Sequence, residues 1–194
     1  MPMETAEIVQ GLREQRLTTL ALADQIGDDR WWEPLLPGEA TLHDMLAHLL
    51  GWDEWATAVF EISAYRELPE VLVEAARNVD DYNARAQTRY RPLTRDDLLG
   101  GLQSATPRVI TSAMGRGESG WETRRIAQLT YEGVGGKRQE DGTIRPPSVR
   151  GILHLLLNHE REHDEEISAV FGVTANLERF TGGDETPQAG PEAK

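Results

Sequence analysis

The chain has 194 residues, a formal net charge of −13 and no cysteine. This length suits one domain, which buries a sufficient core without cross-links. The interspersed acidic excess argues against nucleic-acid binding, and the lack of cysteine excludes disulfides, thiolate ligands and a cysteine nucleophile. No apolar run reaches the roughly 18 residues that span a bilayer. We therefore expect a cytoplasmic protein that binds neither nucleic acid nor membrane, in which any thiol chemistry uses a thiol co-substrate.

The predicted elements are all helices. Apolar residues recur at threes and fours over about 3–26, 42–65, 71–90, 95–114 and 149–171. Capping residues precede three of these segments: Thr41 with Asp44, Thr94, and Ser148. Gly172 is a typical helix stop. No alternating strand pattern of convincing length occurs, so the sequence predicts an all-α fold.

The segments between these helices are less regular. Gly100, Gly101 and Pro107 predict a bend in the fourth helix. Residues 115–147 form a long glycine-rich connection, which we interpret as a candidate lid, with a possible short helix around 123–129. We expect a single helical domain over residues 1–172, with an additional short or kinked helix and this long connection before the last helix. Residues 173–194 have the composition of a largely disordered tail.

Three histidines form a candidate metal site. His159 and His163 are four residues apart, so a helix projects them from one apolar face. His48 lies on the inward side of another helix, whereas His43 and His154 point away from these faces. Catalytic zinc needs three protein ligands and an open position, and bundle interiors build such sites from facing helices. The alternative is that each histidine is a hydrogen-bonded core residue.

The second helix is apolar on two sides. Leu46 and Leu50 lie on the side opposite His48. An apolar surface of this kind is covered by another element or by another subunit. We interpret the two leucines as a possible homodimer contact.

His159 and Glu160 also begin a literal H-E-x-x-H motif, in which the glutamate of a zinc protease is the general base. The metzincin continuation fails, because Glu166 and Ala169 stand where glycine and the third histidine belong. The chain also lacks the strands that hold a protease substrate. A metalloprotease is therefore the less favoured reading, with Glu160 facing solvent or a neighbouring helix.

The order and spacing of these residues resemble the DinB/YfiT-like superfamily of bacterial four-helix bundles. The similarity covers Leu42-x5-His48-Leu49-x2-Trp52 and Ser148-Val149-x4-His154-x4-His159-x3-His163-x3-Ile167, and extends over residues 5–172. It implies an antiparallel-crossed four-helix bundle that is frequently a homodimer. It also implies a divalent metal, commonly zinc or nickel, bound by His48, His159 and His163.

Function is divided among such relatives, which include thiol-dependent transferases or isomerases, hydrolases and protective proteins. Three neutral imidazoles leave a metal its full charge, so a bound water or thiol loses its proton near neutral pH. We expect a metal-dependent enzyme that activates a low-molecular-weight thiol or water for attack on a small electrophile. The alternative is a non-catalytic, stress-related or small-molecule-sequestering bundle with a structural metal.

Two further groups of residues are candidates for the site. Glu166 lies one turn beyond His163. It is a candidate catalytic acid or base, a candidate fourth ligand or a hydrogen-bond partner of that histidine. The alternative is that Glu166 is a solvated residue at the edge of the helix face. Positive charge also gathers in the long connection, at Arg124, Arg125, Lys137, Arg138 and Arg145. These residues can clamp a carboxylate-bearing thiol or substrate, although such a loop cluster is usually only solvated.

Overall fold

The structure is a computed structural model that describes residues 5–35, 40–115 and 125–177, and these residues are mostly helical. The helices are α1 (Thr5–Asp24), α2 (Leu42–Ser63), α3 (Glu70–Arg77), α4 (Val79–Tyr90), α5 (Arg95–Met114) and α7 (Val149–Phe171). Short 3-10 turns occupy Asp28–Arg30 and Glu132–Val134, and two-residue strands β1 (Lys137–Arg138) and β2 (Ile144–Arg145) form a small hairpin. The predicted all-α class is confirmed.

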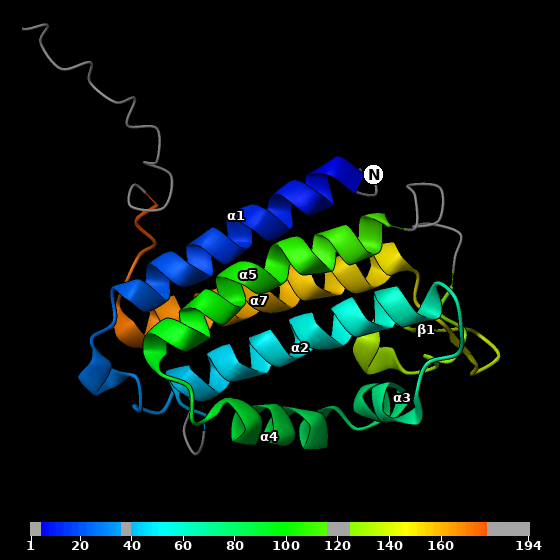
Figure 1. Cartoon of the computed structure of the whole chain (residues 1–194), viewed down its shortest axis with the longest axis horizontal. Helices are drawn as coiled ribbons and strands as arrows, with labels where there is room; N and C mark the ends of the chain where they lie inside the picture. Colours follow the sequence, from blue (N-terminus) through cyan, green and yellow to red (C-terminus); the bar gives the residue numbers. More distant parts are fainter. Residues whose placement is uncertain (1–4, 36–39, 116–124, 178–194) are drawn as a thin grey trace, which may run out of the picture.

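The long helices α1, α2, α5 and α7 lie side by side (Figure 1). Contacts close a ring in which α2 packs on α5, α5 on α1, α1 on α7, and α7 on α2. Figure 1 shows that α1 and α7 run in one direction and α2 and α5 in the other. The first two helices are therefore diagonal rather than adjacent, and α7 lies between them.

Helix capping follows the sequence signals. Thr41 accepts a hydrogen bond from the backbone N–H of Asp44, whose side chain accepts from the Thr41 N–H in return. Ser148 caps α7 through the N–H of Gly151, and Gly172 ends that helix at a φ of 67°. Glycine adopts this left-handed conformation at little cost. These caps fix the register of α2 and α7, the two helices that carry the histidines.

Two local predictions differ from the structure. The segment over 71–90 is not one helix, because Asn78 leaves helical geometry and caps α4 through the N–H of Asp81. α5 continues through Pro107 without a break, and the bend expected there stays a prediction. Residues 125–129 form a bridge and a turn rather than a helix, and 123–124 lie outside the described residues.

Helix α2 is covered by its own chain. Leu46 and Leu50 are 0% and 3% exposed, so they need no second subunit to bury them. A Cβ on Gly101 would lie 3.1 Å from Leu50 Cδ2, which shows how closely α5 approaches α2. The two leucines therefore do not mark a dimer contact, and the homodimer stays a prediction from the family resemblance alone.

The core consists of two hydrophobic clusters at opposite ends of the long helices. One contains Leu12, Trp52 and Leu157, and the other contains Leu20, Leu49 and Ile167. Near the boundary between the two clusters, three helices carry polar residues. α1, α2 and α7 place there the buried Arg16, Thr19, Asp53, Glu160 and Asp164 and the histidines His48, His159 and His163. A polar layer therefore crosses the middle of the bundle.

The described part of the long connection is anchored at three apolar residues. Ile126, Leu129 and Val134 are all buried in the first hydrophobic cluster. Residues 137–143 of the hairpin are exposed, and 116–124 lie outside the described residues, so the lid stays a prediction. At the other end, Val173 packs on the second cluster and Gln25 donates to the Thr174 carbonyl. The rest of the predicted tail, 178–194, also lies outside the described residues.

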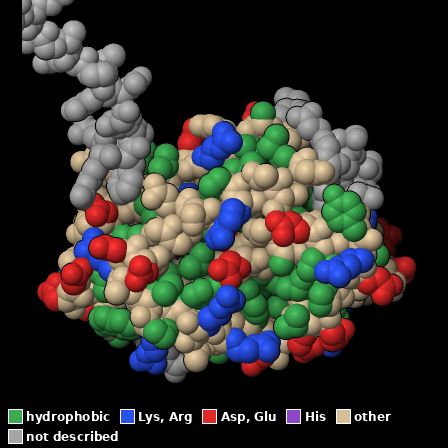
Figure 2. Space-filling view, viewed as in Figure 1, with side chains coloured by type: hydrophobic (Ala, Val, Ile, Leu, Met, Phe, Trp, Pro, Cys, Tyr) green, Lys and Arg blue, Asp and Glu red, His purple; other side chains and the backbone are tan. Residues whose placement is uncertain are grey.

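The surface is mixed in charge. Figure 2 shows acidic and basic side chains interspersed with apolar ones over one face of the molecule. In the described ranges, no helix combines the length and apolar character that a bilayer crossing requires.

Candidate metal centre

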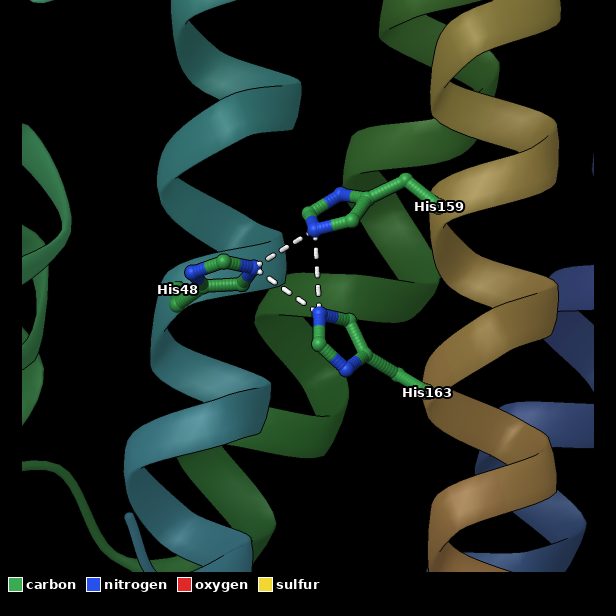
Figure 3. A group of neighbouring side chains, drawn as sticks. All are labelled: His48, His159 and His163. Carbon is green, nitrogen blue, oxygen red and sulfur yellow. Dashed lines mark hydrogen bonds between the residues drawn. The ribbon is translucent and has the colours of Figure 1, made fainter. Parts of the chain in front are cut away.

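Three imidazole nitrogens converge between α2 and α7 (Figure 3). His48 Nε2 lies 3.0 Å from His159 Nε2 and 3.2 Å from His163 Nε2, and the latter two atoms are 3.0 Å apart. The pair on α7 comes from successive turns, and α2 supplies the third ring from across the interface. The structure thus brings together the three histidines that the sequence singled out.

The spacing of these nitrogens suits one divalent ion. Imidazole nitrogens bound at about 2.0–2.1 Å to one tetrahedral or octahedral ion lie roughly 2.8–3.4 Å apart. The observed 3.0–3.2 Å distances fall within this range. Among the described residues, His48, His159 and His163 are the group of three or more metal-ligating residue types whose ligand atoms all lie within 4.8 Å of one another.

A hydrogen bond fixes the tautomer of His163. Its Nδ1 lies 2.8 Å from Glu166 Oε2, and a carboxylate only accepts, so Nδ1 carries the hydrogen. Nε2 is then the nitrogen that faces the other two histidines. A carboxylate on the far nitrogen is the usual partner of a metal-bound histidine. Glu166 therefore orients a candidate ligand.

The environment keeps two of the rings neutral. Burial, together with the adjacent His159 and His163, lowers the pKa of His48 to about 3. Burial and the adjacent His163 lower the pKa of His159 to about 4. A neutral imidazole is the form that binds a metal, so these rings are ready to act as ligands near pH 7.

A small apolar pocket adjoins the histidines. Its volume is about 100 Å³, and His48 and His159 form part of its wall. Its apolar lining includes Trp52, Trp55 and Leu156, and the Trp52 indole N–H donates to Asn83 Oδ1 at 2.9 Å. Asn83 also hydrogen-bonds His48, which opposes the lowering of its pKa. Asn83 therefore connects a pocket wall to a candidate ligand.

Glu160 of the H-E-x-x-H motif faces away from the histidines, toward α1. Its Oε1 lies 2.8 Å from Arg16 Nε and accepts from Thr19 Oγ1 at 2.6 Å. Arg16 Nη2 also pairs with Asp53 Oδ2 at 2.7 Å. Both ion pairs are almost fully buried, so Glu160 is a structural partner of Arg16 and not a base beside the three histidines.

Asp164 extends this network by one turn. Its Oδ2 accepts from Gln15 and Thr19 at 2.6 and 3.1 Å, whereas Oδ1 is buried without a hydrogen-bond partner. Burial, with Glu160 close by, raises the pKa of Asp164 to about 7, and burial raises that of Asp53 to about 6. Arg16 is thus the counter-charge near three buried carboxylates, and it pairs directly with two of them, Asp53 and Glu160. Sequence periodicity missed this network, because it does not show which charged residues meet across a helix interface.

The predicted basic residues separate into two groups. Arg125, Lys137 and Arg145 line one cavity next to the start of α7. Arg138 instead pairs with Glu132 at 2.9 Å, and Arg124 lies outside the described residues. The sequence did not single out Arg150, which lines the same cavity.

The two remaining histidines are separate from the cluster, as periodicity indicated. His43 Nε2 lies 3.3 Å from the Leu93 carbonyl oxygen, and the His43 ring stacks on Trp32. Exposed His154 hydrogen-bonds Asn158.

Comparison of the chain with protein-family models, curated proteins and solved structures finds no match. The case for a function therefore rests on the residues and the geometry.

Proposed function

We propose that the protein is a divalent-metal-dependent enzyme, with a four-helix bundle of the DinB/YfiT-like type, that activates a low-molecular-weight thiol or water for attack on a small electrophile. The observation that carries the proposal is the convergence of three Nε2 atoms within 3.2 Å, beside an apolar pocket. The diagonal placement of α1 and α2 agrees with the crossed connectivity of that family.

A divalent ion supplies positive charge that lowers the pKa of a bound water or thiol toward neutrality. His48, His159 and His163 are the residues that hold it, and Glu166 keeps the His163 lone pair directed at it. Imidazole ligands suit zinc and nickel alike.

The surrounding residues bind and orient the electrophile. Trp52 and Trp55 exclude bulk water from the pocket and present ring faces to an apolar group. With the Trp52 indole N–H already donating to it, the Asn83 side chain retains its amide hydrogens for a polar atom of the substrate. The pocket volume of about 100 Å³ restricts the reacting portion to a small group. The proposed substrate is therefore a small molecule whose reacting end is largely apolar.

A protease mechanism receives no support, because Arg16 and Thr19 hold Glu160 on the side of α7 that faces α1, away from the three histidines. A second candidate is a non-catalytic bundle in which the metal is structural or helps to sequester a small molecule. The small enclosed pocket favours it, since such a pocket retains a ligand without requiring chemistry.

The test is spectroscopic and uses cobalt-loaded, tag-free protein. We expect titration with 2-mercaptoethanol to produce a thiolate-to-cobalt charge-transfer band that the His163→Ala variant lacks. If water is the nucleophile, the zinc-loaded protein instead hydrolyses an activated ester and the variant does not. Protein that binds cobalt yet shows neither the band nor the hydrolysis contradicts the enzyme and supports the non-catalytic alternative.

A further inference from the structure

A second cavity, of about 440 Å³, lies beside the first turn of α7. Its described lining residues include four cationic side chains, Arg125, Lys137, Arg145 and Arg150, and no carboxylate. The chain as a whole has 33 acidic and 20 basic residues, so the cavity lining is basic although the chain is acidic. We call it the basic cavity.

The hairpin places two of these charges directly against each other. Lys137 and Arg145 are Cα partners across β1 and β2, and opposite residues of an antiparallel pair project to the same face. Like charges in this arrangement are destabilising. Among the described residues neither has an ion-pair partner, whereas neighbouring Arg138, on the other face, pairs with Glu132. The repulsion between Lys137 and Arg145 is therefore not relieved by the described part of the chain.

The cavity walls are held in position by backbone contacts. Arg125 forms a β-bridge with Ser148, and the Ile126 N–H donates to the Pro147 carbonyl at 3.0 Å. Gly135, at a φ of 86°, packs so closely that an added Cβ would lie 3.3 Å from the Gly151 carbonyl oxygen. The first turn of α7 contains no acidic residue, so the helix dipole adds positive potential there. An anion thus meets preformed cations rather than a loose loop.

The basic cavity and the apolar pocket share a wall. Leu155 lines both, and His159 lies one turn further along α7 in the apolar pocket. At 1.5 Å per residue, the helix advances about 6 Å from Leu155 to His159 and about 12 Å from Gly151. A molecule of this length, anionic at one end, can occupy both spaces.

We propose that the basic cavity is a recognition subsite for a small organic anion with two or more negative charges, on carboxylate or phosphate groups. Its other end extends past Leu155 to the three histidines, and this second part rests on the proposed function. Guanidinium groups suit both kinds of anion, because their paired N–H donors match two oxygens at once. The anion also relieves the repulsion between Lys137 and Arg145.

Calorimetric titration of the metal-free full chain tests the subsite by itself. The probes are succinate, its monoamide and its diamide, with glycerol phosphate as the phosphate arm. We expect affinity to fall with each charge removed and to fall at least tenfold in Lys137→Ala and Arg145→Ala. Arg138→Ala, which removes the same charge one residue away, should stay within about twofold of wild type. Binding of succinate or of glycerol phosphate identifies the anionic group.

The subsite is overturned if neither anion binds, if the diamide binds as tightly as succinate, or if Arg138→Ala binds succinate as weakly as Lys137→Ala does.

The link to the histidines is tested on cobalt-loaded protein, with glutathione against its diethyl ester. Glutathione should produce the thiolate band at a concentration at least tenfold lower than the ester, and Lys137→Ala should remove this difference. Anion binding to metal-free protein without any thiolate band supports the subsite and contradicts only its link to a metal enzyme. The link is also overturned if glutathione and its diethyl ester reach half of the full thiolate band at the same concentration.

Discussion

Helix α7 presents two pairs of polar residues to two different neighbours. His159 and His163 face α2 and His48, whereas Glu160 and Asp164 face α1 and Arg16. Each pair is spaced by four residues and lies in the same buried layer of the bundle. The carboxylate side contains its own counter-charge in Arg16. On the histidine side the ring nitrogens point at one another, and no described residue places a cation between them. The fold thus completes the carboxylate side, and we propose that a metal ion completes the histidine side.

Removing Arg16 should produce the largest change in stability. Arg16→Met leaves Asp53, Glu160 and Asp164 buried without their cation, and loss of one partner from a buried ion pair costs about 3–5 kcal/mol. Urea unfolding of metal-free protein measures this loss. His163→Leu is the matched change on the other side of the layer and should cost less than about 1 kcal/mol. Equal losses in the two variants would contradict the comparison.

Glu166 sharpens the comparison on the histidine side. Glu166→Ala removes the acceptor from His163 Nδ1, and loss of such a partner lowers metal affinity about 10–100-fold. Because Glu166 is partly exposed, we expect a value near the lower end of this range. Competition with a chromogenic chelator measures the affinity. Adjacent Glu165→Ala has the same charge change, and a similar loss in that variant would argue against a specific role for Glu166.

The pH dependence of metal-free protein should separate the two sides. The pKa of Asp53 is raised to about 6 in the fold, so the folded state binds the extra proton and stability falls as pH rises from about 4 to 6. The pKa values of His48 and His159 are lowered to about 3 and 4, so the unfolded state binds the extra protons and stability rises with pH up to about 6.5.

These opposing contributions flatten the profile of the wild-type protein. In the Asp53→Asn variant, the free energy of unfolding should rise more steeply with pH between pH 4 and 6. The slope should increase by at most about 1.4 kcal/mol per pH unit, because the substitution removes one titrating proton. Replacing His48 by Asn should change the slope in the opposite direction. Chemical unfolding at several pH values measures both slopes, and a shift of the same sign in the two variants would refute the assignment.

The histidine site could be predicted from the sequence because its information is local. A spacing of four places His159 and His163 on one face, and periodicity alone turns His48 inward and His43 and His154 away. The helix bounds were also predictable where Thr41, Ser148 and Gly172 mark the ends. These features depend on residues close together in the chain.

The remaining features depend on tertiary partners. Arg16 looks like a surface residue until Asp53 and Glu160, from two other helices, meet it. Leu46 and Leu50 suggested a second subunit because the sequence does not show how closely Gly101 brings α5 to α2. Similarly, Lys137 and Arg138 differ in role because a two-residue strand directs them to opposite faces, and such a short hairpin has no periodicity to detect.

The most direct test of the metal centre is the metal content of tag-free protein after equilibrium dialysis against zinc. Wild type and His154→Ala, a control on an exposed histidine of the same helix, should each retain one zinc per chain. His48→Ala and His163→Ala should retain less than about a tenth of that amount, because each leaves only two ligands for the ion. Zinc retained equally by all four proteins would contradict the account.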